Sequence, residues 1–215
     1  MNCSLIITAG GTSSRYGKTN KLLEKIDSET VIEHSVKPFL GFKEIAEVII
    51  PSNKLIINEL RQIFNNPKIK LIDGGSTRQE SVYKALLQVE NEYVIIHDGA
   101  RPLITEKIIS NVLNQVKKYG AVSVMTKTTD TIKEVDENGK IIKTIDRSKL
   151  YNTQTPQAFR TAILKEVHEK YRGKSFTDDC SMLEESGFDV FIAEGDSTNI
   201  KITSKSDLDF AKLYI

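Results

Sequence analysis

Short apolar runs rich in isoleucine and valine alternate with longer amphipathic segments along the first 127 or so residues of the chain. The apolar runs fall at residues 4–10, 44–52, 69–75, 92–100 and 121–127. The amphipathic segments fall at residues 31–40, 54–64, 78–89 and 106–120. This alternation is typical of βαβ units, and continuous apolar strands are those of a parallel sheet covered on both faces. It predicts a doubly wound, mostly parallel α/β sheet with ligands at the carboxyl ends of the strands.

A different pattern begins at residues 131–146. Asn138-Gly139 stands there between two runs of alternating apolar and polar residues, which predicts a β-hairpin with a type I′ turn. We expect this hairpin to form an arm over about residues 131–150. Because a two-stranded ribbon is marginal alone, it should pack against another surface, and a second subunit is one plausible partner.

The last third of the chain predicts further elements of the same domain. We expect a loop at 152–159, a helix from about Arg160 to Tyr171, a helix around 178–187, strands at 188–195 and 199–203, and a C-terminal helix capped by Ser204 and Asp207. No repeat or linker interrupts the pattern, and 215 residues suit one core. We therefore expect a single domain over residues 1–215.

The charge balance argues against several classes of partner. Thirty basic residues stand against 29 acidic ones, for a formal net charge of +1, so no overall field favours nucleic acid or a membrane surface. The two cysteines, Cys3 and Cys180, lack metal-ligand spacing and favour reduced thiols over a disulfide framework. No cationic leader or membrane-length apolar run is evident. These features predict a soluble, cytoplasmic protein.

The glycine-rich stretch "AGGTSSRYGKT" at residues 9–19 resembles two known nucleotide loops but has the wrong spacing for both. A Walker-type loop has four residues between its first glycine and Gly-Lys-Ser/Thr, whereas five separate Gly11 from Gly17. In a dinucleotide fingerprint that began at Gly10, Thr12 and Arg15 would replace the second and third glycines. The stretch therefore argues against a P-loop NTPase and against a nicotinamide-dependent dehydrogenase.

The same loop still suits a nucleoside triphosphate. Small residues after the first strand allow backbone N–H groups to approach a ligand closely, and Arg15 and Lys21 can straddle a polyphosphate. A surface loop with solvated cations is the competing interpretation.

Further candidate residues follow other predicted strands. Asp98 and Gly99, in "HDGARP", follow the strongest apolar run, where a carboxylate can hold Mg²⁺ or a ribose hydroxyl, although Asp98 could also be a turn residue. Gly74 and Gly75 begin a second glycine-lined edge that could receive a base or ribose, or could be a simple strand-to-helix turn. Lys201 lies within "NIKIT", where an inward-facing cation would need an anionic partner.

Six blocks in order closely resemble the 2-C-methyl-D-erythritol 4-phosphate cytidylyltransferase family. They are "TAGGTSSRYG" with "NKLL", "GGSTRQESV", "HDGARP", "DRSKLYNTQTPQAF", "TDDCSMLEESG" and "NIKIT", and together they span nearly the whole chain. The resemblance implies a Rossmann-like sheet of the nucleotidyltransferase type with a projecting β-arm. It also implies transfer of CMP from CTP to the polyol phosphate in non-mevalonate isoprenoid biosynthesis, a requirement for Mg²⁺, and a homodimer formed through the arm.

The resemblance also assigns roles to residues that match the family's motifs. Catalytic roles fall to Arg15, Lys21 and Lys201. Nucleotide-binding roles fall to Ala9, Gly10, Gly11, Gly75, Ser76, Ser81, Asp98 and Gly99, with Asp98 also at the metal. Binding of the polyol phosphate falls to Arg101, Thr131, Arg147, Thr155, Thr177 and Lys201, with Thr131 and Arg147 contributed by the partner's arm.

The implied chemistry fits the absence of an obvious catalytic base in the sequence. The nucleophile is an oxygen of the acceptor's own phosphate, which is already anionic at neutral pH. The work of the protein is then positioning and electrostatic stabilisation. A ribitol 5-phosphate cytidylyltransferase, which shares the loop and the chemistry, is the nearest alternative, and a non-catalytic nucleotide-binding module is an alternative of another class.

Overall fold

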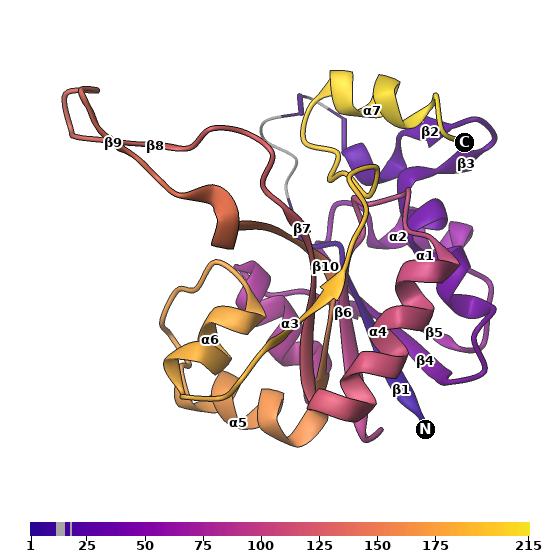
Figure 1. Cartoon of the computed structure of the whole chain (residues 1–215). Helices are drawn as coiled ribbons and strands as arrows, with labels where there is room; N and C mark the ends of the chain where they lie inside the picture. Colours follow the sequence, from indigo (N-terminus) through magenta and orange to yellow (C-terminus); the bar gives the residue numbers. More distant parts are fainter. Residues whose placement is uncertain (12–15, 18) are drawn as a thin grey trace.

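A seven-stranded sheet forms the centre of the described chain (Figure 1). The computed structural model describes residues 1–11, 16–17 and 19–215. Across the sheet the strands are β11 (Phe191–Glu194), β7 (Ala121–Lys127), β10 (Tyr151–Arg160), β6 (Tyr93–Asp98), β1 (Cys3–Thr8), β4 (Ile45–Ser52) and β5 (Ile69–Asp73). All pair in parallel except β10, which is antiparallel to both neighbours. The mostly parallel sheet predicted from the sequence is confirmed.

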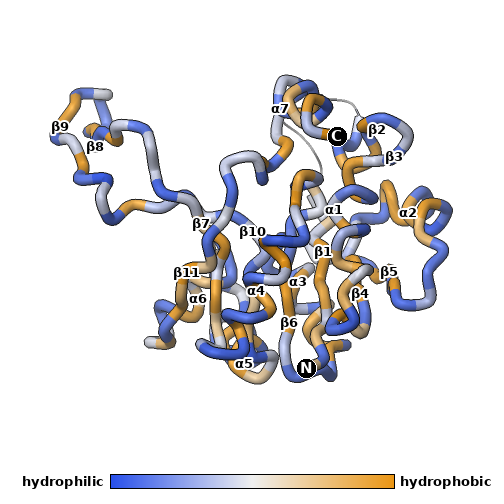
Figure 2. Tube along the Cα trace, turned by 45° about the vertical axis from the view of Figure 1, so that its right-hand side comes forward, coloured by the Kyte–Doolittle hydropathy of each residue, from blue (hydrophilic) through white to orange (hydrophobic). Residues whose placement is uncertain are grey.

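Helices cover both faces of the sheet. They are α1 (Val31–Leu40), α2 (Ile57–Ile63), α3 (Arg78–Leu86), α4 (Glu106–Tyr119), α5 (Thr161–Lys170), α6 (Asp179–Glu185) and α7 (Lys205–Ala211). Because side chains alternate across a strand, Leu5 and Ile7 of β1 pack with α1 and α4, whereas Ile6 packs with α3 and α5. Figure 2 shows the hydrophobic residues concentrated along the central strands. The continuous apolar runs thus supply two cores at once.

The segment predicted as a loop at 152–159 is instead most of β10. It lies between β6 and β7, with Ala158 opposite Ile95 and Val122. Pro156 has no N–H for the ladder, and the pairing with β7 is interrupted between Thr153 and Gln157. The prediction of a loop is therefore wrong, because a proline among polar residues is not the usual pattern of a central strand.

A β-hairpin lies within the residues where the arm is predicted, but its turn is of another type. β8 (Lys133–Val135) pairs antiparallel with β9 (Ile141–Thr144), and the ribbon projects away from the sheet (Figure 1). A type I′ turn needs positive φ at both central residues, yet only Gly139 of the Asn138-Gly139 pair has it. The Gly139 N–H donates to the Asp136 carbonyl over 3.1 Å, so the turn spans one residue earlier and the glycine follows it in the left-handed region.

The C-terminal part differs from expectation at one predicted strand. Residues 199–203 do not form a strand, because their backbone hydrogen bonds are not those of a sheet. The Ile202 N–H, for example, donates to the carbonyl of Ala100, in the loop after β6, over 2.8 Å. The capping pair of Ser204 and Asp207 at the start of α7 is confirmed.

Smaller elements complete the described chain. A short hairpin joins β2 (Lys25–Ile26) to β3 (Glu29–Thr30), and single 3₁₀ turns lie at Lys21–Leu23 and Arg147–Lys149. Among the described helices, none is long and apolar enough to span a bilayer.

Candidate active site

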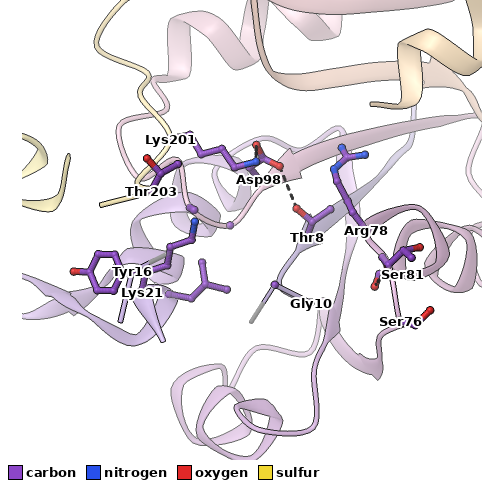
Figure 3. A pocket seen from close by; sticks show the side chains of 15 residues that line it. Thr8, Gly10, Tyr16, Lys21, Ser76, Arg78, Ser81, Asp98, Lys201 and Thr203 are labelled. Atoms are coloured by element: carbon purple, nitrogen blue, oxygen red, sulfur yellow. Dashed lines mark hydrogen bonds and ion pairs between the residues drawn. The ribbon is translucent and has the colours of Figure 1, made fainter. Parts of the chain in front are cut away.

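A cleft with two adjoining compartments opens at the carboxyl ends of β1 and β6, and Figure 3 shows the first of them. The first has a volume of about 390 Å³ and is lined by residues that include Gly10, Gly11, Lys21, Ser76, Ser81 and Gly99. The second has a volume of about 420 Å³ and is lined by residues that include Arg101, Thr155 and Thr177. Arg78, Asp98 and Lys201 line both. One carboxylate and two cations therefore mark the boundary between the compartments.

Asp98 is the charged centre of this boundary. The Lys201 ammonium lies 2.9 Å from Oδ2, and the Arg101 Nε lies 3.4 Å from the same oxygen. The Thr8 hydroxyl donates to Oδ1 over 3.3 Å. Burial raises the pKa of Asp98, but Lys201, Arg78 and Arg101 lower it by more, so the net pKa lies well below its usual value. The carboxylate is therefore ionised and faces several cations. A bound anion, such as a phosphate, could form ion pairs with these same cations.

A buried polar chain holds the Asp98 backbone. The Asp98 N–H donates to the Thr155 hydroxyl oxygen over 3.0 Å, and that hydroxyl lies 3.0 Å from Nδ1 of His97. His97 Nε2 lies 3.3 Å from the Arg101 carbonyl, which can only accept. The proton of neutral His97 is therefore on Nε2, and Thr155 donates to Nδ1. Thr155 thus orients the Asp98 loop through bonds within the protein.

We expect this buried histidine to make folding stability depend on pH. Burial lowers the pKa of His97 from 6.5 to about 4. The unfolded chain therefore binds more protons between these values, and stability falls as the pH falls from about 6.5 towards 4. The loss should reach roughly 3 kcal/mol beyond that of a His97→Gln variant, measured by urea unfolding across this range. Parallel pH profiles for the two proteins would contradict this expectation.

Glycines and Ser81 shape the wall of the first compartment. The Ser81 hydroxyl accepts from the Gly75 N–H over 2.9 Å and donates to the Thr77 carbonyl over 2.8 Å. A Cβ at Gly10 would lie 3.0 Å from this hydroxyl oxygen, and one at Gly75 would lie 2.4 Å from the Glu80 Cβ. These positions therefore require glycine for close packing of the loops after β1 and β5.

Lys21 links the first loop to the segment that carries Lys201. It begins a 3₁₀ turn capped by Asn20, whose side chain accepts from the Leu22 N–H over 3.0 Å. The Lys21 ammonium donates to the Ile202 carbonyl over 2.7 Å. Residues 199–203 are held from the other side, where Arg101 Nη1 donates to the Asn199 carbonyl over 2.7 Å. Both lysines are thus placed at the cleft by contacts far apart in sequence.

Most of the residues selected from the sequence lie at this cleft, with clear exceptions. Ala9 is buried in a β-bridge with Ser52, and neither it nor Gly75 lines a compartment. Thr131 and Arg147 lie on the projecting arm, where Arg147 donates to the Thr129 carbonyl, and neither lines the cleft of its own chain. Arg15 lies outside the described residues.

Arg78 is the boundary residue that the sequence reasoning did not select. Its position two residues after Ser76, at the start of a helix that follows a Gly-Gly edge, was the available signal.

The donor set at the boundary fits a metal ion that arrives with a polyphosphate. No group of three or more His, Cys, Asp or Glu residues that could hold a metal occurs in the described part of the chain. Mg²⁺ is commonly bound by one or two carboxylates together with substrate phosphates. Among the described residues that line the cleft, Asp98 is the single carboxylate shared by both compartments, and its ionised state suits that kind of site.

A glycine-lined cleft with boundary cations, at the carboxyl edge of a doubly wound sheet, is typical of α/β proteins that bind nucleotide phosphates. The comparisons with known proteins specify the family. The model of the 2-C-methyl-D-erythritol 4-phosphate cytidylyltransferase family matches residues 3–215, and the chain belongs to this family.

Individual relatives agree with this assignment over nearly the full length. The cytidylyltransferase of this name from Bacillus cereus is 39% identical over 220 residues, covering 99% of this chain and 97% of the relative. That from Aquifex aeolicus is 40% identical over 209 residues, covering 96% and 94%. The crystal structure of 4-diphosphocytidyl-2C-methyl-D-erythritol synthase from Anaerococcus prevotii has a TM-score of 0.88 at 30% identity, covering 99% of this chain and 95% of the other.

Proposed function

We propose that the chain transfers CMP from CTP to 2-C-methyl-D-erythritol 4-phosphate at the boundary of the two compartments. CTP would occupy the compartment beside Lys21 and the glycines, and the polyol phosphate would occupy the one beside Arg101 and Thr177. The observation that carries this proposal is the sharing of Arg78, Asp98 and Lys201 by both compartments. Two anions that enter from opposite sides would meet there.

The proposed reaction needs no protein nucleophile or general base. An oxygen of the acceptor phosphate attacks the α-phosphorus of CTP, the bond to the bridging oxygen breaks, and pyrophosphate leaves with the electron pair. Negative charge accumulates around the α-phosphate, and cations held in advance stabilise it. Lys21 and Lys201 would serve this purpose, with Arg15 as a third donor. Arg101, Thr155 and Thr177 would hold or frame the acceptor.

We also propose Mg²⁺ as the cofactor, with Asp98 as its protein ligand. The ion would neutralise and orient the triphosphate. The proposal is supported by the ionised state of Asp98 and its place at the boundary. Asp98 would hold the ion, and Lys201, 2.9 Å from this carboxylate, would bind the phosphates.

A homodimer formed through the arm is a further part of the proposal. Ile141 and Ile142 on β9, and Val135 on β8, are each more than half exposed. Apolar side chains on a projecting ribbon favour burial against a partner. Thr131 and Arg147 would then reach the partner's acceptor compartment.

Two buried free cysteines, Cys3 and Cys180, support a reducing, cytoplasmic location.

The test of the function is product formation from two competing acceptors. The purified protein is given CTP and Mg²⁺ with either 2-C-methyl-D-erythritol 4-phosphate or ribitol 5-phosphate, and pyrophosphate release and the CDP product are measured. We expect turnover with the first acceptor and at least about a tenfold lower kcat/KM with the second, since acceptor selectivity is a difference in transition-state binding. Preference for ribitol 5-phosphate would reassign the acceptor, and silence with both would leave a nucleotide-binding module.

A further inference from the structure

Arg78 lies at the boundary of the two compartments without belonging to the set of lysines and arginines to which the family motifs assign roles. It is the first residue of α3 and follows the N-cap Thr77, whose hydroxyl accepts from the Glu80 N–H over 3.0 Å. Its side chain is 31% exposed, so the guanidinium reaches the cleft. Figure 3 shows Arg78 and Lys201 on either side of Asp98. Arg78 therefore faces the place where the two substrates would meet.

The guanidinium is fixed from the protein interior. Arg78 Nη1 donates to Oδ2 of Asp179 over 2.7 Å, and Asp179, the first residue of α6, has no exposed surface. The other carboxylate oxygen, Oδ1, lies 2.9 Å from Nε2 of His168, which is 1% exposed and comes from α5. The Tyr83 ring of α3 stacks on His168 with ring centroids 6.3 Å apart. Three helices thus determine the orientation of one arginine.

The charge state of Asp179 suits this supporting position. Burial raises the pKa of Asp179, but the positive charge of Arg78 and the hydrogen bond from His168 lower it by more. The carboxylate is therefore ionised and forms a true ion pair with Arg78. Buried ion pairs contribute little net stability because desolvation offsets their attraction, so stability alone does not account for this one well.

The guanidinium also keeps donors for a ligand. A guanidinium carries five N–H donors in a planar fork that matches phosphate oxygens. Within the described part of the chain, Arg78 donates one hydrogen bond, the one to Asp179. Asp98 and Asp179 together raise the pKa of Arg78 more than burial lowers it, so the group stays charged beside Asp98. The remaining donors can therefore contact a phosphate at the boundary.

We propose that Arg78 is a further catalytic residue, which donates to the phosphate oxygens at the transfer point, and that Asp179 is the positioning residue that orients it. This inference rests on the proposed function and extends it to a residue pair 101 positions apart in sequence. Arg78 would act in the reaction from the wall opposite Lys201. Because the fork is held before substrate binds, it contributes to the transition state without reorganisation.

The test compares variants that keep charge with variants that keep shape. Arg78→Lys retains a cation but loses the planar fork, and we expect kcat to fall about 100-fold while the KM for CTP changes less. Asp179→Asn keeps the shape and loses the charge, and we expect kcat to fall about tenfold, which is the loss of orientation alone. The double variant should be no slower than Arg78→Lys, because Asp179 acts through Arg78. Arg61→Lys, at an exposed arginine of α2 that bonds to Asn58 and lines neither compartment, is the matched control and should turn over normally.

Two outcomes would overturn the inference, and both differ from failure of the proposed function. If the wild-type protein is active and Arg78→Lys turns over at the wild-type rate, Arg78 only ties α3 to α6. If the losses from Arg78→Lys and Asp179→Asn multiply in the double variant, Asp179 does not act through Arg78. Urea unfolding of each variant separates a loss of stability from a loss of activity. If Asp179→Asn does not fold, the activity of Arg78→Lys alone decides the catalytic role. Silence of the wild-type protein would refute the function itself.

Discussion

Replacing Lys21 by alanine is expected to lower kcat by roughly two orders of magnitude or more, as loss of one preorganised donor to a charged transition state does. The Lys21 ammonium lines the first compartment and is oriented there by the Ile202 carbonyl, 2.7 Å away. Lys201, which also lines this compartment, is paired with Asp98 and would have to move to take the place of Lys21. The measurement is steady-state pyrophosphate release with CTP and methylerythritol phosphate.

Two controls separate this catalytic loss from damage to the fold. Loss of the bond from Lys21 to Ile202 should cost only about 1 kcal/mol of unfolding free energy, so the variant should remain folded under assay conditions. Lys25→Ala removes an exposed lysine of β2, four positions further along the chain, and should keep wild-type turnover. Wild-type kcat in Lys21→Ala would remove Lys21 from the mechanism.

The parallel strands of the sheet could be predicted because their continuous apolar runs are a strong sequence signal. Runs such as residues 92–100 are apolar on both faces, and only a doubly covered strand buries both. β10 carried no such signal, because Gln154, Thr155 and Gln157 are polar and Pro156 interrupts the ladder. These polar side chains are buried all the same, and each forms a hydrogen bond with a partner distant in sequence. Gln157 Nε2, for example, donates to Asp178 over 2.7 Å.

The site residues also differ in how far local sequence could predict them. Asp98 could be predicted because it ends the strongest strand, and strand ends meet at one edge of the sheet. An inward-facing Lys201 predicts an anionic partner, and that partner is Asp98. The strand predicted at residues 199–203 is not formed. Arg78 was missed because a cation on an amphipathic helix resembles a surface residue. Its buried partner, Asp179, belongs to a helix that no spacing rule connects to α3.

Replacing Lys201 by methionine is expected to lower kcat at least about 100-fold, because it removes one of the two cations that line both compartments. Methionine keeps the length and the apolar stem of lysine. Asp98 would retain Arg101, 3.4 Å away, so the carboxylate should stay paired and the fold intact. Lys205→Met, at an exposed lysine four positions further on, is the matched control. The same pyrophosphate assay measures both, and wild-type turnover in Lys201→Met would refute the role.

The Lys201→Met variant also tests whether the arm completes the partner's site. Arg147→Ala should be severely impaired alone if its guanidinium serves the partner's acceptor compartment. Light scattering should first give a mass near twice the 24.2 kDa of one chain. In an equal mixture of the two variants, after subunit exchange, each mixed dimer would hold one site with both Lys201 and a partner Arg147, and about one quarter of wild-type activity should return.

A second mixture serves as the control for this recovery. Lys21→Ala and Lys201→Met both alter the cleft of their own chain, so each site in their mixed dimer still lacks one lysine, and no activity should return. Recovery in the first mixture and not in the second requires Arg147 to act across the dimer, because both mixtures contain the same proportion of mixed dimers. Equal silence in both would place Arg147 outside the partner's site and leave the arm, with its exposed Ile141 and Ile142, as a contact surface alone.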